Sequence, residues 1–362
     1  MLSDYLLIIV SSVTAMLIST ILIPCWIKVC AKWNLFEKTD DRKRHKESIP
    51  TMGGIAIFAG ISISFLAFSG GLGTYNGAQL IAAVIITFFT GFFDDLTDLK
   101  PSRKVLFQLM ASVLAILAGF RIESLYGLFG IYTLPLVISW GATIFFIIAV
   151  TNALNLIDGL DGLAGSLTLV SSIIFGILFL QAGNLPMAML SFSVSGAVFG
   201  FLIYNFHPAR IFMGDTGSLV LGFLLSIQAI ALFQLYTQGS PDVPALTPAL
   251  IAAVLFLPMY DVLRVSVIRI ITGYSPFHPD RNHVHHMIVG QGFGQRITTL
   301  MIAGFNLMYV GIAMLFPQMG INSFIILCVC LGMLTMNTLT MSWLALMYGR
   351  LGGRLYDRTV KA

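Results

Sequence analysis

Long apolar runs alternate with short polar stretches along the whole chain. A bilayer core about 30 Å thick needs about 20 helical residues to cross it, and most of the runs have about that length. The pattern predicts an all-α, polytopic membrane protein with about eleven transmembrane helices, folded as a single integral-membrane domain, 1–362. The predicted spans lie at about 5–27, 50–69, 78–93, 105–120, 131–150, 163–182, 186–206, 217–236, 246–271, 298–316 and 321–347.

Basic residues mark every second loop between these runs. If the N-terminus lies outside, the loops after the odd-numbered spans lie inside, and every Lys and Arg except Arg121 falls in or beside them. Lys and Arg next to membrane spans mark the cytoplasmic side. The sequence therefore predicts a periplasmic N-terminus and a cytoplasmic C-terminus.

The composition agrees with a bilayer environment and narrows the choice of partners. Apolar residues make up 57% of the chain and charged residues 10%, compared with about 25% charged in soluble domains. The net charge of +4 follows the predicted topology, so we expect a lipid bilayer and no nucleic acid as partner. The four cysteines lack the paired spacing of a zinc site, and we expect reduced core residues.

Acidic residues and histidines gather on the same predicted side. All six histidines and every acidic residue except Asp4, Glu123 and Asp242 lie at the cytoplasmic face. Acidic residues contribute little to topology, so their distribution indicates an active site in a cleft at that face. A cation-coupled transporter is a distant alternative, because its acidic residues should lie near the bilayer midplane.

Adjacent carboxylates end the third span. Asp94 and Asp95 repel each other at a membrane boundary and need a metal, a cation or a shared proton. A solvated helix end is the plainer interpretation. Lys104 follows at the start of the next span, where it could meet an anionic lipid headgroup or serve only as a topology marker.

The segment 151–163 carries Asn152, Asn155, Asp158 and Asp161 at three-residue spacing. In a helix these side chains would project toward one side and line one cavity. Carboxylates near membrane depth are costly unless they serve ions or substrates. A structural turn with polar caps is the alternative.

Three further segments complete the candidate chemistry. Asp215 lies between two glycines where an inner loop enters a span, which suits a magnesium ligand or a helix cap. The histidines of 276–286 could bind zinc. Because the many acidic residues favour a magnesium site instead, we expect these histidines and Arg281 to donate hydrogen bonds to a pyrophosphate. The basic stretch 41–46 is typical of a topology marker or an anionic-lipid contact. No phosphate-binding loop or Rossmann fingerprint is present.

Together, and in this order, the motifs from Lys46 to His286 resemble those of the polyprenyl-phosphate N-acetylhexosamine-1-phosphate transferases, a family that includes the phospho-muramoyl-pentapeptide transferases. The loop 279–286 is similar to the H-x-H-H form of the sugar-only branch, the undecaprenyl-phosphate α-N-acetylglucosaminyl-1-phosphate transferases. It lacks the three consecutive histidines of the muramoyl-pentapeptide branch.

This resemblance implies an enzyme of the bacterial inner membrane that transfers N-acetylglucosamine 1-phosphate from UDP-N-acetylglucosamine to undecaprenyl phosphate. UMP would be the second product. The reaction would be the first membrane step in making O-antigen and common-antigen lipid-linked glycans for the lipopolysaccharide and the cell envelope.

The resemblance also implies residue roles and a Mg²⁺ cofactor, for which Mn²⁺ could substitute. Asp215 and Asn155 would bind the metal, and one carboxylate of the Asp94–Asp95 pair would act as a base at the lipid phosphate. The catalytic set would be Asp94, Asp95, Asp158, Asp161 and His283. The substrate-binding set would be Lys46, Thr51, Lys104, Asn205, Arg269, Arg281, His285 and His286.

Several alternatives stay open at this point. The donor could be another UDP-N-acetylhexosamine, such as UDP-N-acetylgalactosamine, or the UDP-muramoyl-pentapeptide. The lipid phosphate could attack directly, or an aspartate could first form a covalent intermediate. A homodimer is also compatible with the sequence.

Overall fold

Helices account for nearly all of the regular structure in the computed structural model. The structure describes residues 2–33, 35, 49–69, 76–125, 127–237, 247–275, 282–316 and 319–333. In chain order, the helices are α1 (Leu2–Trp33), α2 (Gly54–Phe68), α3 (Gly77–Thr97), α4 (Pro101–Leu117), the 3₁₀ turn η1 (Leu128–Gly130), α5 (Leu136–Ile157), α6 (Leu163–Gln181), α7 (Leu185–Asn205), α8 (Gly214–Thr237), α9 (Thr247–Ile271), α10 (Val284–Gly290) and α11 (Gln295–Leu315). A further apolar helix, Ile321–Met333, follows.

Each predicted apolar run coincides with a helix. Within the described ranges, 8 helices are long and apolar enough to cross a membrane, namely α1, α3, α5 to α9 and α11. The predicted spans at 50–69 and 105–120 correspond to shorter helices, α2 and α4. The predicted span at 321–347 is helical over Ile321–Met333, and the rest of it lies outside the described residues. The protein is therefore an all-α, polytopic membrane protein.

One helix, α10, was not predicted from the hydrophobic pattern. α10 lies in the middle of the segment expected to be an inner loop, and its 7 residues are too few to give a recognisable helical period. It places His285 and His286 on a helix, directly after His283 at its N-cap.

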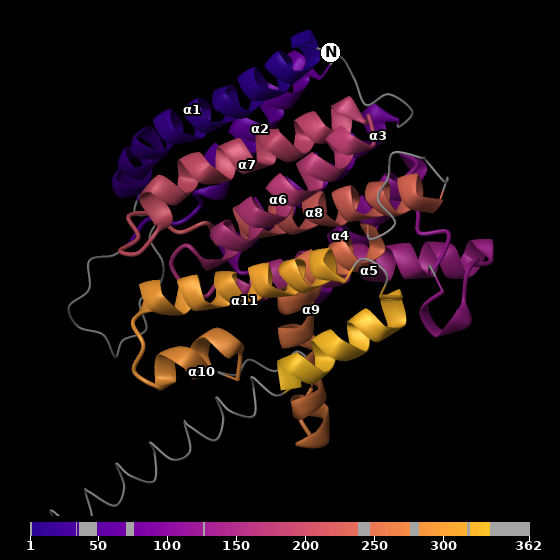
Figure 1. Cartoon of the computed structure of the whole chain (residues 1–362). Helices are drawn as coiled ribbons and strands as arrows, with labels where there is room; N and C mark the ends of the chain where they lie inside the picture. The colour runs from indigo at the N-terminus through magenta and orange to yellow at the C-terminus, as the bar shows by residue number, and fades with distance from the viewer. Residues whose placement is uncertain are drawn as a thin grey trace, which may run out of the picture.

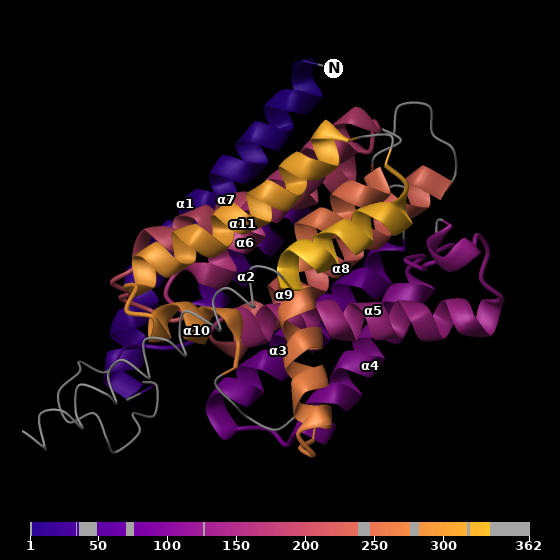
Figure 2. The ribbon, with the colours of Figure 1, turned by 60° about the horizontal axis from the view of Figure 1, so that its bottom comes forward.

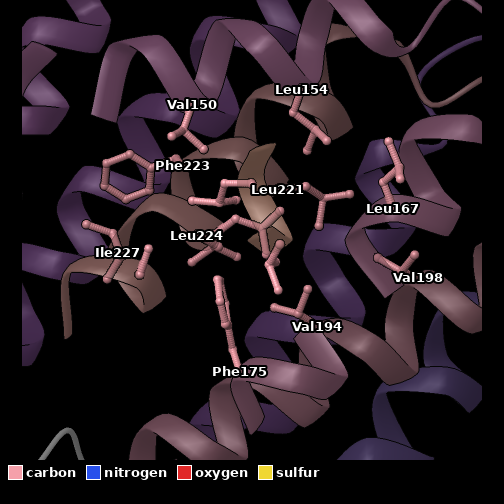
Figure 3. Packing of buried hydrophobic residues seen from close by; sticks show 14 of the residues in the cluster. Val150, Leu154, Leu167, Phe175, Val194, Val198, Leu221, Phe223, Leu224 and Ile227 are labelled. Carbon is pink, nitrogen blue, oxygen red and sulfur yellow. The ribbon is translucent and has the colours of Figure 1, made fainter. Parts of the chain in front are cut away.

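Helix α8 forms the centre of the bundle. It packs against α3 and α5 and also contacts α2, α6 and α9, and it is apolar on all sides, as expected for a buried helix. In Figure 3, Leu221 and Leu224 of α8 lie among Val150 of α5, Phe175 of α6 and Val194 of α7. The acidic start of α8 is thereby fixed relative to several neighbouring helices.

Small residues bring α1 and α7 together at the edge of the bundle (Figure 1). A Cβ atom added to Gly196 would lie 2.1 Å from the Ser12 carbonyl oxygen. Next to this contact, the Ser11 and Ser193 hydroxyls hydrogen-bond at 2.7 Å. Close backbone approach and interhelical hydrogen bonds are the usual basis of helix association in membranes.

Helix α9 crosses the other long helices steeply, and its C-terminal end projects from the bundle in both views (Figures 1 and 2). Pro258 lies inside it, where a proline removes a helical hydrogen bond. Beyond Pro258, Leu263, Val267 and Ile270 are each more than half exposed. This half of α9 therefore presents apolar side chains outward.

All four cysteines are free, as predicted. Cys30 and Cys328 are buried, whereas Cys25 and Cys330 are exposed on their helices. The expectation of core positions is thus right for two of them and wrong for the other two, because outward-facing positions of a membrane helix are apolar as well.

Candidate active site

Four helix ends bring the predicted acidic motifs together. Asp94 and Asn155 lie in the last turns of α3 and α5, and Lys104 and Asp215 lie in the first turns of α4 and α8. The Lys104 ammonium group donates to Asp94 Oδ2 at 2.8 Å and to Asp215 Oδ2 at 2.5 Å, and it lies 3.3 Å from Asn155 Oδ1. The lysine thus neutralises two carboxylates that would otherwise repel each other.

Asn155 and Asp215 form the oxygen-rich part of this cluster. Asn155 Nδ2 donates to Asp215 Oδ1 at 2.7 Å and to the Ser218 hydroxyl at 2.9 Å. Asp94 completes the group and also accepts a hydrogen bond from the Leu99 amide at 2.8 Å. Two carboxylates, an amide oxygen and a hydroxyl are hard donors of the kind that magnesium prefers.

Asp95 caps α8 from the neighbouring helix. The backbone amides of Asp215 and Thr216 donate to its two oxygens at 2.8 and 2.9 Å, and the Thr216 hydroxyl donates as well. A carboxylate is favourable at a helix N-terminus, where backbone N–H groups lack partners. Both Asp95 oxygens hold the start of α8 in place, so Asp94 is the member of the pair that contacts Lys104 in the cluster.

Glycines allow the backbones of α2, α3 and α8 to approach closely at this site. A Cβ atom on Gly91 would lie 2.3 Å from the Asp215 carbonyl oxygen, and one on Gly54 would lie 2.1 Å from the Gly217 nitrogen. Gly214 has a φ of +72°, a conformation that side chains other than glycine rarely adopt. The starts of α2 and α8 and the end of α3 can therefore lie in contact.

The segment 151–163 is helical only up to Ile157, so the shared side that a continuous helix would give its four polar side chains does not form. α5 ends at Ile157, and a turn follows that passes through Gly162 at φ +75°. Asn152 does not join the site, because it exchanges two hydrogen bonds with Gln108 of α4, at 3.2 and 2.9 Å. The glycines end the helix, so three-residue spacing does not carry over to the last two aspartates.

Asp158 and Asp161 have different surroundings in this turn. Burial raises the pKa of the half-buried Asp158 carboxyl well above its usual range, and the negative charges of Asp215, Asp95 and Asp161 act in the same direction. Asp161 Oδ2 instead lies 2.7 Å from His207 Nδ1 and accepts from the Ala209 amide at 3.1 Å. Asp158 is therefore the better candidate to meet a cation or a ligand donor.

Two predicted substrate-binding residues, Asn205 and Thr51, lie where loops meet inside the protein. Asn205 donates from Nδ2 to the Ile211 carbonyl at 2.8 Å, and its Oδ1 accepts from the Gly162 amide at 2.9 Å. Thr51 lies in a loop that pairs with 212–213, where the Gly53 amide donates to the Phe212 carbonyl at 2.9 Å. Each polar atom of the Asn205 side chain thus makes a hydrogen bond inside the protein.

The histidines at 283, 285 and 286 lie at the start of α10. His285 is buried against the turn after α5, since a Cβ atom on Gly159 would lie 2.7 Å from His285 Nε2. Burial lowers the pKa of the His285 imidazole to about 3, and the neighbouring His286 acts in the same direction. His285 is therefore a neutral ring at pH 7, while His286 is exposed.

Asp261 of α9 is a site residue that the sequence reasoning did not identify. It is 2% exposed and accepts a hydrogen bond from the ring of His283, at 2.8 Å between Oδ2 and Nδ1. From the sequence it counts among the acidic residues of the cytoplasmic face but has no assigned role, although a carboxylate inside an apolar run is a signal of function. Arg269, on the same helix, is buried, whereas Lys46 and Arg281 lie outside the described residues.

Known proteins show similarity over most of the chain. Residues 78–233 match the family described as glycosyl transferase family 4. A probable undecaprenyl-phosphate N-acetylglucosaminyl 1-phosphate transferase of Bacillus subtilis is 31% identical over 307 residues, which are 82% of this chain and 81% of that protein. The chain belongs to glycosyl transferase family 4.

Other members of the family lead to the same conclusion. The undecaprenyl-phosphate α-N-acetylglucosaminyl 1-phosphate transferase of Yersinia pestis is 31% identical over 76% of this chain and 75% of its own length. The one of Escherichia coli K12 is 30% identical over 76% and 74%. The resemblance drawn from the motifs is thus confirmed, and the protein is a membrane sugar-1-phosphate transferase of the polyprenyl-phosphate N-acetylhexosamine-1-phosphate class.

Proposed function

We propose that this transferase joins N-acetylglucosamine 1-phosphate from UDP-N-acetylglucosamine to undecaprenyl phosphate. The observation that carries the proposal is the cluster of Asp94, Lys104, Asn155 and Asp215, which combines a cation with oxygen donors at one end of the bundle. The names of relatives about 30% identical and the H-x-H-H loop support this donor and this acceptor.

The site faces the cytoplasm of a bacterium in this proposal. All residues of the cluster lie at helix ends next to loops that carry the basic residues, and such loops stay on the cytoplasmic side. About eleven spans with the N-terminus in the periplasm satisfy this orientation. Nucleotide sugars would then reach the site from the cytoplasm and the lipid from the inner membrane.

The donor set of the cluster fits magnesium. Among the described residues, no group of three or more His, Cys, Asp or Glu side chains could hold a metal by itself, but magnesium usually combines one or two carboxylates with substrate phosphates. Asp215 and Asn155 would hold the ion. When bound, it would neutralise the diphosphate of the donor and favour departure of UMP.

The side chains of the chain then have distinct tasks. Lys104 binds the phosphate of the acceptor lipid, and Asp94 orients the ammonium group. A phosphate oxygen of the lipid forms a bond to the β-phosphorus of the donor, and the bond from that phosphorus to the UMP oxygen breaks. Because a phosphate monoester loses its second proton near pH 6, direct attack needs little help from a base, so Asp94 serves mainly to position Lys104.

The decisive experiment measures UMP release by purified protein with undecaprenyl phosphate, magnesium and UDP-N-acetylglucosamine. We expect release that requires both lipid and metal and falls at least about 10³-fold in Asp215→Ala. Asp98→Ala is the matched control, because Asp98 is an exposed carboxylate of the same face. No UMP from folded wild-type protein would contradict the proposal, and release only with UDP-N-acetylgalactosamine or UDP-muramoyl-pentapeptide would correct the donor.

A single-turnover measurement addresses the covalent alternative. Direct attack predicts no burst of UMP when the lipid is left out. A burst equal to the amount of enzyme, lost in Asp94→Asn, would instead establish an aspartyl intermediate.

A further inference from the structure

A buried carboxylate in α9 binds the histidine motif. Asp261 Oδ2 lies 2.8 Å from His283 Nδ1, while Oδ1 accepts from the Val284 amide at 3.0 Å and from Arg264 Nη2 at 3.2 Å. A carboxylate at this depth is costly unless it is paired and hydrogen-bonded. These three contacts account for its presence inside a membrane helix.

Arg264 extends the same contact by one residue. It lies one helical turn after Asp261 and also donates to the Asn282 carbonyl oxygen. The two α9 side chains therefore bind three consecutive residues, 282–284, through a carbonyl, an imidazole and an amide. α10 has only 7 residues, too few to be stable alone, so its position depends on these contacts.

His283 is connected to the acidic cluster through its neighbour. The rings of His283 and His285 lie 5.8 Å apart at an interplanar angle of 12°, and His285 packs on Gly159, next to Asp158. An ionised carboxylate can only accept hydrogen bonds, so Nδ1 of His283 carries the proton that Asp261 accepts. Nε2 is then the nitrogen that remains for a ligand.

We propose that Asp261 is a positioning residue for the transfer reaction. It fixes the proton on His283 Nδ1 and the plane of the ring, so that Nε2 is directed to the pyrophosphate of the nucleotide sugar. The proposal rests on the proposed function for the identity of that ligand. The hydrogen bond made by one ring nitrogen decides whether the other nitrogen carries a proton. In metal sites, loss of the residue that hydrogen-bonds a ligating histidine changes affinity or activity by about 10- to 100-fold.

The kinetic test compares Asp261→Ala, Asp261→Asn, His283→Ala and the double variant Asp261→Ala/His283→Ala. We expect Asp261→Ala to lower kcat/KM for the donor by about 100-fold, with KM for undecaprenyl phosphate unchanged. Asp261→Asn keeps the size of the side chain and an acceptor oxygen, so it should recover part of the loss. The double variant should lose little more activity than Asp261→Ala alone, since both single changes remove the same hydrogen bond between Asp261 and His283.

A purely structural role gives a different result. If Asp261 only stabilised α10, the losses in the double variant would multiply, and KM for the lipid would change together with KM for the donor; either result would overturn the proposal. Tyr260→Phe, at the neighbouring position of α9, is the control for general perturbation of this helix and should keep wild-type kinetics. Thermal unfolding in detergent verifies that each variant is folded.

A second measurement does not depend on the reaction. In protein labelled with ¹⁵N-histidine, one Nδ1–H signal should disappear in His283→Ala and should also be lost in Asp261→Ala. Retention of that signal in Asp261→Ala would disprove the contact, whatever the donor is. Wild-type protein that releases no UMP but shows the Asp261-dependent signal would refute the proposed function while the positioning of His283 stands.

Discussion

At the scale of single residues, Lys104 has the clearest assigned task. It is the cation between Asp94 and Asp215, and an anionic lipid headgroup at this interface needs such a partner. We expect Lys104→Gln to lower kcat/KM for undecaprenyl phosphate by about 100-fold or more, because charge-assisted hydrogen bonds at a transferring phosphoryl group are lost. Steady-state kinetics with varied lipid concentration measure this effect.

The matched control for this residue is Lys100→Gln. Lys100 is exposed just before α4, so the substitution changes the net charge equally but leaves the cluster intact. Equal losses of kcat/KM in both variants would show that the overall positive charge of the loop, and not the Lys104 contact, attracts the lipid. Lys104→Arg should recover only part of the activity, because a planar guanidinium does not reproduce the compact ammonium group.

At the scale of helices, the contact of α3 with α8 decides the position of Asp215. Gly91→Ala places a Cβ atom 2.3 Å from the Asp215 carbonyl oxygen, so one helix must shift. We expect a free-energy cost of about 1–3 kcal/mol and a loss of UMP release of at least about tenfold. Thermal unfolding and the UMP assay measure the two effects.

Gly304→Ala in α11 is the control for Gly91, because a Cβ atom there meets nothing within 4 Å. It should be neutral or slightly stabilising, since alanine favours helices over glycine. Unaltered stability and activity of Gly91→Ala would mean that α3 and α8 do not approach as described.

The helices also show what the sequence can predict. The apolar runs predict the helices because their length and composition are set by the bilayer, and the motifs stand out because charged residues are rare in such a chain. The pairing of Asp95 with the start of α8 joins residues 120 positions apart, and no local pattern contains it. Asp261 and α10 were missed because one lies inside an apolar run and the other is shorter than a helical period can reveal.

At the scale of the whole molecule, the orientation in the membrane decides which substrates can reach the site. The positive-inside pattern predicts that Asp98 lies in the cytoplasm and Glu123 in the periplasm, and both are exposed side chains outside the acidic cluster. In a variant without its natural cysteines, Glu123→Cys should react with a membrane-impermeant maleimide in intact spheroplasts. Asp98→Cys should react only after the membrane is permeabilised. The reverse result would place the cluster in the periplasm, where no nucleotide sugar is supplied, and the proposed donor would have to be abandoned even if purified protein released UMP.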